Sequence, residues 1–473
     1  MTEPIRHARL WEDPSEPVAL RGPRRAPKTA DWALAIIALT ATLSTTAAAT
    51  SLGGGRVGAM VFAGTAFLTG SYCAVRLPSA HLSYVVAIWL LAPLVRRVTD
   101  WVDLEFSEQS PASLAPYLAS AACVLGLTNR RRFIPRHIAS ALLVTHSVLA
   151  VAWLFGSVFN GVSAATLAFL EWSSPILVMS YALSMVPGLR VLVIRLALAT
   201  CITVGSYGVF QYFHPPKWDL FWIEAAPINS VGEAVAGGFR VFSTLNSPGP
   251  MAMVVALAML LLMASRSTGY AMLSLLAMPA LALSLVRSAW LVVVIGIAVL
   301  TLGRASSWQS RASGAVVSLG LVALAATFPV ATVSDVANRL ETTASLSDDT
   351  SFQARLAFTQ DFLAQAVNPI GHGLGSSGVS ARLTSESSAP SLIAFDNGLL
   401  NVPYTLGSLG FVAFIYAFVR LRRHAYETLA DPPSALGGLV AVALLGLAFT
   451  NVLTGVTGIF VGLLYSAWAG DQR

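Results

Sequence analysis

Residues 249–265 read GPMAMVVALAMLLLMAS, an apolar run without one charged side chain. Such a run suits a helix whose whole circumference is buried in protein or lipid. The rest of the chain has the same character, because 55% of its 473 residues are hydrophobic and only 11% are charged. Soluble domains carry about 25% charged residues, so this chain has too few charges to cover a surface exposed to water. The composition therefore predicts an integral membrane protein.

Apolar stretches of this kind recur along the whole chain, although several are shorter than the ~20 residues that cross a bilayer comfortably. We therefore predict an all-α, polytopic transmembrane bundle of about 12–14 spans. The candidate spans are 32–51, 57–75, 79–95, 112–128, 137–156, 166–187, 190–210, 249–265, 270–286, 289–303, 313–333, 403–420, 435–452 and 454–470.

Basic residues mark every second connection between these spans, and this bias predicts the orientation. The residues that carry it are Arg21, Arg24, Arg25, Lys28, Arg76, Arg130, Arg131, Arg132, Arg136, Arg190, Arg266, Arg304, Arg311, Arg420, Arg422 and Arg423. With these connections inside the cell, both termini are cytoplasmic. Connection 96–111 then lies outside and offsets its two arginines with acidic residues. The net charge of +6 comes from 29 Lys and Arg against 23 Asp and Glu, and the placement of the basic residues matters more than its size. No basic, aromatic-interleaved domain is present to bind nucleic acid.

The same pattern divides the chain into six expected segments. They are a disordered cytoplasmic tail (1–31), N-terminal transmembrane helices (32–210), a periplasmic loop (211–248), transmembrane helices with arginine motifs (249–333), a large periplasmic loop (334–402) and C-terminal transmembrane helices (403–473). Within the large loop, Thr350 and Gln353 form a capping box ahead of an amphipathic helix over 351–366. Gly371, Gly373 and Gly375 make the backbone beyond that helix pliant.

The first candidate site motif is Arg240-Val-Phe-Ser-Thr-Leu-Asn246-Ser-Pro248, which leads into span 249–265. Asn246 or Ser247 is a good N-cap, and proline suits a first helical turn. A helix N-terminus carries free N–H groups that can receive an anion, and Arg240 adds a bidentate phosphate binder. The alternative is an ordinary capped helix with an interfacial arginine.

The second motif is Ser284-Leu-Val-Arg287-Ser288, in a short connection between two spans. The shortness of this connection keeps Arg287 near the bilayer, where a charge costs ~3 kcal/mol. Arg240 and Arg287, both at the outer face, would suit a lipid-borne anion between them. A snorkelling loop arginine is the alternative reading of Arg287.

The third motif is Asp396-Asn397-Gly398, where the large loop re-enters the membrane. Asp396 could act as a general base or bind a sugar hydroxyl, provided that burial or a like charge raises its pKa. A turn or N-cap role is the alternative. Weaker candidates are Arg355, His372 within Gly371-His-Gly373, Glu171 and His146.

In this order and spacing, the motifs resemble those of the O-antigen ligase/polymerase superfamily of bacterial envelope glycosyltransferases. That family has an Arg shortly before an aromatic–x–x–x–Asn–x–Pro helix start and a Ser-Arg pair after the next-but-one helix. It also has a large periplasmic loop with an Arg-led helix, a Gly-x-Gly-x-Gly turn and a closing His-Asn dipeptide. The counterparts over residues 235–415 are Arg240, Asn246, Pro248, Arg287, Ser288, Arg355, the Asn368–Gly375 stretch, Asp396 and Asn397.

The resemblance implies a GT-C-type membrane glycosyltransferase of the bacterial inner membrane. Its donor would be an oligosaccharide on undecaprenyl diphosphate, and its acceptor a glycan held by the 334–402 loop. Arg240 and Arg287 would stabilise the departing diphosphate, Asp396 would be the base, and Asn246, Ser288, Arg355, His372 and Asn397 would bind substrate. A single displacement at C1 inverts the anomeric configuration. No cofactor is expected, and without a metal-binding cluster in the sequence we predict metal independence.

One departure bears on the product. Ligases that join O-antigen to lipid A–core carry His where this chain has Asp396, which favours a polymerase of exopolysaccharide, capsule or O-antigen, working with a chain-length regulator and a flippase. An O-antigen ligase is the alternative within this class. A lipid-linked glycan flippase or transporter is the alternative from another class, although its cavity should be lined with charges that these spans lack.

Overall fold

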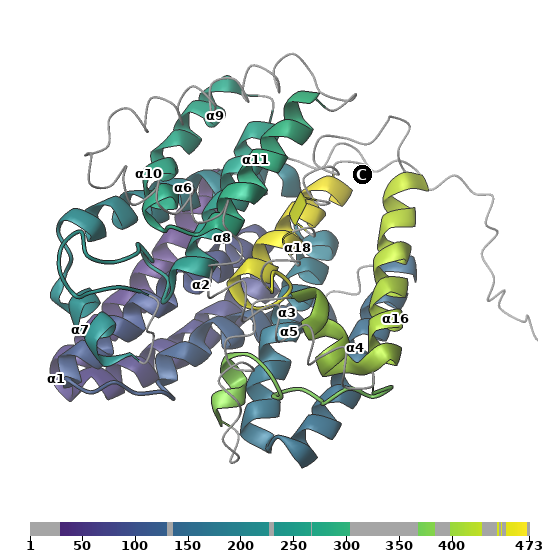
Figure 1. Ribbon diagram of the computed structural model, residues 1–473, viewed down its shortest axis with the longest axis horizontal. Helices are drawn as coiled ribbons and strands as arrows, with labels where there is room; N and C mark the ends of the chain where they lie inside the picture. Colours follow the sequence, from purple (N-terminus) through teal and green to yellow (C-terminus); the bar gives the residue numbers. More distant parts are fainter. Residues whose placement is uncertain are drawn as a thin grey trace, which may run out of the picture.

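A computed structural model describes residues 29–129, 136–226, 231–265, 267–302, 368–383, 398–427, 442–443, 446 and 451–470. In these ranges the chain is helical, and the one β-feature is an isolated bridge between Gly232 and Phe239. The helices are α1 (Thr29–Arg76), α2 (Pro78–Asp103), η1 (Pro111–Leu114), α3 (Ala115–Asn129), α4 (Arg136–Phe159), α5 (Val162–Met185), α6 (Leu189–Phe213), α7 (Lys217–Ala225), α8 (Pro248–Ala264), α9 (Thr268–Ser274), η2 (Leu275–Ala277), α10 (Met278–Leu283), α11 (Arg287–Leu302), η4 (Val379–Leu383), α16 (Gly398–Glu427) and α18 (Gly455–Gly470) (Figure 1).

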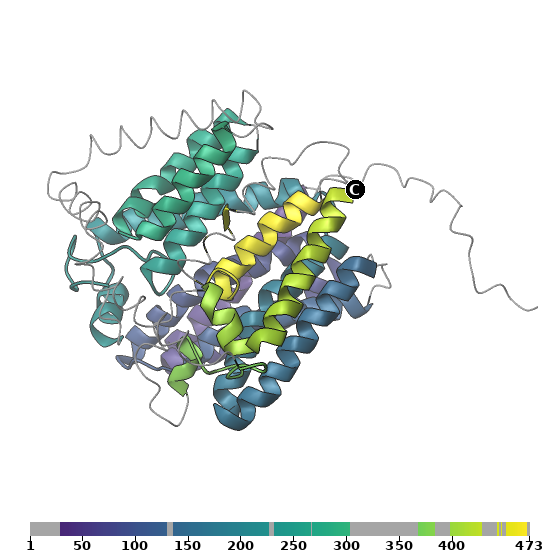
Figure 2. The ribbon, with the colours of Figure 1, turned by 45° about the vertical axis from the view of Figure 1, so that its right-hand side comes forward.

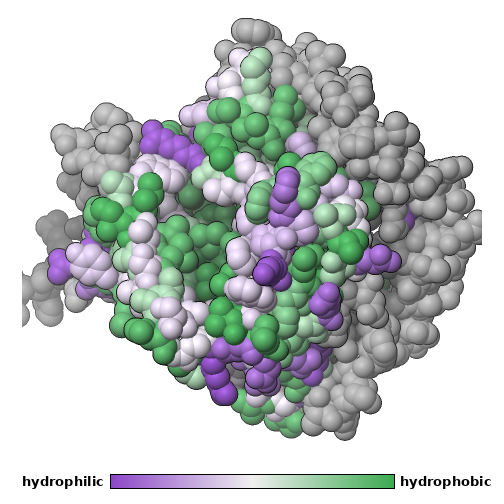
Figure 3. Space-filling model, turned by 90° about the vertical axis from the view of Figure 1, so that its left-hand side faces the viewer, coloured by the Kyte–Doolittle hydropathy of each residue, from purple (hydrophilic) through white to green (hydrophobic). Residues whose placement is uncertain are grey.

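The apolar helices have the dimensions of a membrane bundle. Among the described residues, seven helices are long and apolar enough to cross a bilayer, and four shorter apolar helical stretches accompany them. Large apolar side chains such as Leu68, Leu143 and Leu409 are exposed on the helices, as expected where lipid replaces water. Figure 3 shows one face of the molecule on which hydrophobic side chains cover much of the described surface and hydrophilic ones form separate patches, one of them along the lower edge. The prediction of an all-α, polytopic membrane protein is confirmed.

Helix α8, the run quoted at the outset, lies at the centre of the bundle. Every residue from Met251 to Ala264 is buried, because α6, α9, α10, α11 and α18 all pack against it. A helix that is apolar all round can be stable only when it is enclosed in this way. Helix α18 packs on α5, α6 and α8, whereas α16 lies alongside α4 (Figure 2). The two C-terminal helices therefore contact α4, α5 and α6 of the N-terminal region as well as the central helix α8.

The first two predicted spans form one helical element, α1, with a sharp kink at Gly54. Gly54 has φ 84°, a left-handed conformation that glycine adopts without steric cost. Beyond the kink the helix restarts, and the Asp103 carboxylate accepts hydrogen bonds from Gly55 N (2.6 Å) and Arg56 N (2.7 Å). A carboxylate at a helix N-terminus satisfies free N–H groups and complements the helix dipole.

Helix α2 corrects one sequence-based boundary. We predicted a span over 79–95 followed by an outer connection over 96–111, but α2 continues to Asp103, so Arg96 and Arg97 are helical. The helix tolerates these charges because each has an acidic partner. Arg96 Nε lies 3.5 Å from Asp100 Oδ2, and Arg97 Nη1 lies 2.8 Å from Asp219 Oδ1.

Five further predictions concern the second half of the chain. The span expected over 270–286 is interrupted, since α9, η2 and α10 follow one another there. The span expected over 403–420 begins earlier, at Gly398, and is kinked at Gly407 (φ 73°). The span expected over 313–333 and the amphipathic helix expected over 351–366 lie outside the described residues, as does most of the span expected over 435–452.

Candidate active site

Arg240 lies against the turn that leads into Arg287. Its Nε donates a hydrogen bond to Ser284 O (3.0 Å), and its Nη2 lies 3.5 Å from Leu285 O. The next residue, Val241, donates its N–H to Leu283 O (3.1 Å). Residues 240–241 and 283–285, more than forty residues apart in sequence, are thus joined by hydrogen bonds. The two predicted site arginines therefore lie at one end of the bundle.

Arg287 is the first residue of α11, and Ser288 follows it in the first turn. Both are half-buried. A helix N-terminus carries a partial positive charge, so the arginine adds its full charge where the backbone already favours an anion. The N-terminus of α8 lies at the same end of the bundle, because the segment that precedes it is bonded to the α10–α11 turn.

The start of α8 offers further polar groups. Ser247 is the N-cap and has extended backbone angles, but its side chain makes no capping hydrogen bond. Asn246 O accepts from Trp222 Nε1 (3.2 Å). The Asn246 Oδ1 and Thr244 Oγ1 atoms are buried and have no hydrogen-bond partner among the described residues. Buried polar atoms are normally satisfied, so these two atoms are available to a ligand hydroxyl or a water molecule.

A buried polar network that the sequence analysis missed lies directly behind this segment. Arg97 Nη2 donates to Ser243 O (2.6 Å), and Gln211 Oε1 accepts from Ser243 N (2.8 Å). Asp219 accepts through Oδ2 from Gln211 Nε2 (2.8 Å) and Tyr207 OH (2.9 Å). Burial raises the pKa of the Asp219 carboxyl, and the nearby Arg97, Gln211 and Tyr207 oppose that rise. No local signal pairs these residues, because Arg97 and Asp219 are far apart in sequence.

His372 lies on a different set of elements. Its N–H donates to Tyr404 O (2.9 Å), and its ring stacks on the Tyr404 ring with centroids 4.1 Å apart. Its carbonyl accepts from Asn160 Nδ2 (2.8 Å), which also bonds Leu374 O (3.1 Å). The glycine turn around His372 is therefore fixed between the α4–α5 connection and the kink of α16.

Beside that turn, three buried polar side chains form a cluster that the sequence analysis also missed. Thr405 Oγ1 donates to Asn401 Oδ1 (2.8 Å), and Ser377 Oγ donates to Asn401 Oδ1 (3.3 Å) and lies 3.3 Å from Thr405 Oγ1. Asn401 and Thr405 are four residues apart in α16, which places them on neighbouring turns of the helix. This spacing is the one signal in the sequence that could have indicated the pair.

Several predicted residues are not placed at this site. Asp396, Asn397 and Arg355 lie outside the described residues. His146 Nδ1 bonds Leu142 O (2.8 Å) within its own helix, and Glu171 lies 3.5 Å from Tyr117 OH, between α5 and α3. No group of three or more His, Cys, Asp or Glu side chains that could hold a metal occurs in the described part of the chain.

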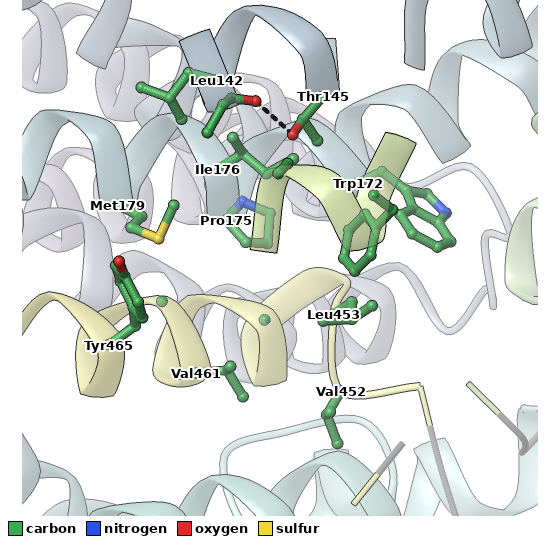
Figure 4. Close-up of a pocket in the computed structure, with 15 residues that line it drawn as sticks. Leu142, Thr145, Trp172, Pro175, Ile176, Met179, Val452, Leu453, Val461 and Tyr465 are labelled. Carbon is green, nitrogen blue, oxygen red and sulfur yellow. Dashed lines mark hydrogen bonds between the residues drawn. The ribbon is translucent and has the colours of Figure 1, made fainter. Parts of the chain in front are cut away.

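An apolar pocket lies elsewhere, between α4, α5, α16 and α18 (Figure 4). Its walls include Trp172, Pro175 and Met179 of α5 and Phe414 of α16, and among the residues that the structure describes no charged side chain lines it. Such a pocket suits an apolar chain rather than a sugar or a phosphate. None of the predicted site residues contributes to it, so it is separate from the arginine pair.

One of the comparisons with known proteins supports the family resemblance. No curated protein matches the chain. Residues 271–415, however, match the sequence profile of the O-antigen ligase family. That stretch contains Arg287, the glycine turn and the kinked start of α16. The resemblance found in the sequence is thus confirmed, and the chain carries, over residues 271–415, a domain of the O-antigen ligase/polymerase superfamily.

Proposed function

We propose that this membrane glycosyltransferase joins glycan repeat units carried on undecaprenyl diphosphate, at the periplasmic face of the inner membrane. The product would be a polysaccharide, and the acceptor a second lipid-linked or growing glycan. Both termini would be cytoplasmic, which leaves the 211–248 and 334–402 segments on the periplasmic side. Membership of the superfamily supports the general activity, whereas the donor, the face and the product are our proposals.

The observation that carries the proposal is the contact of Arg240 with the turn before Arg287. It brings Arg240 to the end of the bundle where α8 begins and where Arg287 starts α11. Guanidinium groups bind phosphate oxygens through paired hydrogen bonds, and helix N-termini add further donors. This combination suits a diphosphate headgroup at the membrane boundary better than it suits a neutral sugar.

The chemistry needs little more than charge and orientation. An acceptor hydroxyl attacks C1 of the donor sugar, the C1–O bond to the diphosphate breaks, and the anomeric configuration inverts. The leaving diphosphate gains negative charge, which fixed positive groups stabilise most strongly in a site with little water. The hydroxyl proton goes to a base, for which Asp396 is our candidate. Ser288, Asn246, Arg355, His372 and Asn397 are our candidates for binding substrate.

An O-antigen ligase that transfers glycan to lipid A–core would use the same arginine pair. Asp396, in place of the ligase histidine, favours the polymerase. The deciding experiment supplies purified protein with a lipid-linked repeat unit, with and without lipid A–core. A ladder of products without the core acceptor supports polymerisation, whereas transfer only to lipid A–core would establish a ligase and reject the polymerase.

A lipid-linked glycan flippase would give neither product in that assay. A deletion strain would further distinguish a flippase from a polymerase. Loss of a polymerase leaves single repeat units exported, whereas loss of a flippase leaves lipid-linked units on the cytoplasmic side. Accumulation of cytoplasmic units would contradict the proposed enzyme.

A further inference from the structure

Ser243 lies three residues after Arg240 and adopts an unusual backbone conformation. Its φ is 52°, in the left-handed region that residues other than glycine seldom occupy. Its N–H, its carbonyl and its hydroxyl are all bonded to other elements of the bundle. Ser243 N donates to Gln211 Oε1 (2.8 Å), and Ser243 Oγ donates to Val204 O (2.5 Å). A strained conformation persists only when its surroundings hold it in this way.

The carbonyl of Ser243 is held by Arg97, whose side chain is fully buried. One terminal nitrogen of Arg97 donates to Ser243 O (2.6 Å), and the other lies 2.8 Å from Asp219 Oδ1. The guanidinium carbon also lies 4.8 Å from the centre of the Phe242 ring. Arg97 thus spans from the carboxylate of α7 to the main chain of the Arg240 segment, which lysine, with a single ammonium group, cannot reproduce.

Asp219 also acts on the Phe242–Ser243 main chain indirectly, through Gln211. Its Oδ2 accepts from Gln211 Nε2 (2.8 Å), which orients the Gln211 amide. The oxygen of that amide therefore faces the segment and accepts from Phe242 N (3.3 Å) and Ser243 N (2.8 Å). Tyr207 OH, itself bonded by Trp218 Nε1 (2.9 Å), completes the shell of donors around the carboxylate.

From these contacts we propose that the Arg97–Asp219 pair is a positioning device for Arg240. It holds the main chain at Phe242–Ser243 from behind, while Arg240 and Val241 bind the α10–α11 turn on the other side. The inference rests on the proposed function for Arg240, but neither residue of the pair contacts substrate. Both lie outside the 271–415 match, so the profile does not assign them a role.

The rival explanation is that the pair only supports folding. Removing one partner of a buried ion pair leaves an uncompensated charge, so a single substitution cannot separate the two explanations. The charge-neutral double variant Arg97→Met/Asp219→Asn removes the ion pair without leaving a buried charge. The reversed variant Arg97→Asp/Asp219→Arg keeps an ion pair but places its donor on α7, away from Ser243 O. If the pair served folding alone, both variants would retain full activity once folded.

The matched control is Tyr84→Phe. Tyr84 is on the same helix, is buried, and bonds Thr42 (2.8 Å) far from the Arg240 segment. This variant removes one buried hydrogen bond from α2 without changing the network behind Ser243.

Hydrogen exchange on the full-length protein in lipid nanodiscs tests the holding contact without any substrate. In Arg97→Met/Asp219→Asn, exchange of the Val241, Phe242 and Ser243 amides should rise by about tenfold, the effect of one lost hydrogen bond. Exchange in α8 should stay as in the wild type, and Tyr84→Phe should leave all these amides unchanged. Unchanged exchange at 241–243 in the double variant would overturn the inference.

Turnover with the lipid-linked repeat unit tests the consequence. Misplacing Arg240 should lower kcat by about 100-fold. KM for the donor should change less than kcat, because the negative charge that Arg240 stabilises grows as the C1–O bond breaks. Normal kcat in either folded variant would overturn the positioning role and leave the proposed function intact. A wild-type protein that forms no glycosidic bond with any acceptor would overturn the proposed function instead, and exchange alone would then decide whether the pair holds the segment.

Discussion

Gly371 and Gly378 form a matched pair for testing how the glycine turn is held. Both have left-handed backbones, with φ of 78° and 77°. They differ in the space around them. A Cβ on Gly371 would lie 2.3 Å from Gly407 N and 2.6 Å from Thr405 O, whereas a Cβ on Gly378 has no described atom within 4 Å. The variants Gly371→Ala and Gly378→Ala therefore share the cost of the left-handed conformation, and only the first meets main-chain atoms.

The expected difference follows from the contacts. Cβ atoms do not approach other atoms below 3.0 Å, so the turn and the kinked part of α16 must separate by about 0.7 Å. That movement lengthens the bonds from His372 N to Tyr404 O and from Gly373 N to Thr405 O, now 2.9 and 3.0 Å, beyond hydrogen-bonding distance.

In free energy, the left-handed alanine costs roughly 1–2 kcal/mol in both variants. Losing two hydrogen bonds adds about 1 kcal/mol each in Gly371→Ala alone. We therefore expect Gly371→Ala to be less stable than Gly378→Ala by about 2 kcal/mol, or more if strain from overpacking remains.

The assay is thermal unfolding of the two purified variants in the same detergent, with hydrogen exchange at His372 and Gly373 as the local readout. Gly371→Ala should unfold at the lower temperature and lose protection at both amides, and Gly378→Ala should keep that protection. Equal destabilisation by the two variants, or a larger effect at Gly378, would refute the packing of the turn into the α16 kink.

Three further predictions concern the site. Arg240→Met should lower transferase turnover by about 100- to 1,000-fold through loss of leaving-group stabilisation, and Arg240→Lys should fall between it and the wild type because a lysine keeps the charge but not the fork. The control is Arg56→Met, which changes an exposed arginine near the α1 kink. Near-normal product from Arg240→Met would exclude Arg240 from the mechanism. Asn160→Ala should weaken the glycine turn by about 1–3 kcal/mol, since it leaves two carbonyls without their donor. Asn160→Asp should be worse because it places an acceptor against them, and the reverse ranking in thermal unfolding would contradict the assigned contacts. A chelator should leave the initial rate unchanged if arginine charge alone stabilises the diphosphate, and a rate restored only by added divalent cation would reject the predicted metal independence.

The sequence predicted the fold class because apolar composition and helix periodicity are local properties. It also predicted two apolar spans, 32–51 and 57–75, on either side of the Gly54 kink, although it did not predict that they form one kinked element. It misplaced the end of α2. Two consecutive arginines suggest the end of a membrane helix, but Arg96 and Arg97 stay within α2 because Asp100 and Asp219 pair with them. Asp219 lies on a separate short helix, and no spacing rule connects it to Arg97.

For the candidate site, the sequence likewise indicated residues within local motifs but not the long-range contacts that hold them. Arg240 and Arg287 were site candidates from their motifs, and the structure brings their segments together, while their role in catalysis stays a prediction. Asn160 was not recognisable, since its role is to donate to carbonyls of a turn more than two hundred residues away. Contacts between a side chain and a distant main chain depend on the acceptor's backbone geometry, which residue types alone do not encode. The role of Asp396 stays a prediction.

The contacts around the matched domain indicate that residues 271–415 cannot form the site by themselves. The α10–α11 turn, within the match, receives Arg240 and Val241 from outside it. The glycine turn, also within the match, is bonded by Asn160 and by Ala152 O of α4, again from outside. Separated from the residues before 271, the domain would keep Arg287 but lose the segment between α7 and α8 that carries Arg240 and lose Asn160, the donor that fixes the glycine turn. The geometry of the candidate site therefore depends on the whole bundle, because contacts from residues before 271 hold both turns of the matched segment in place.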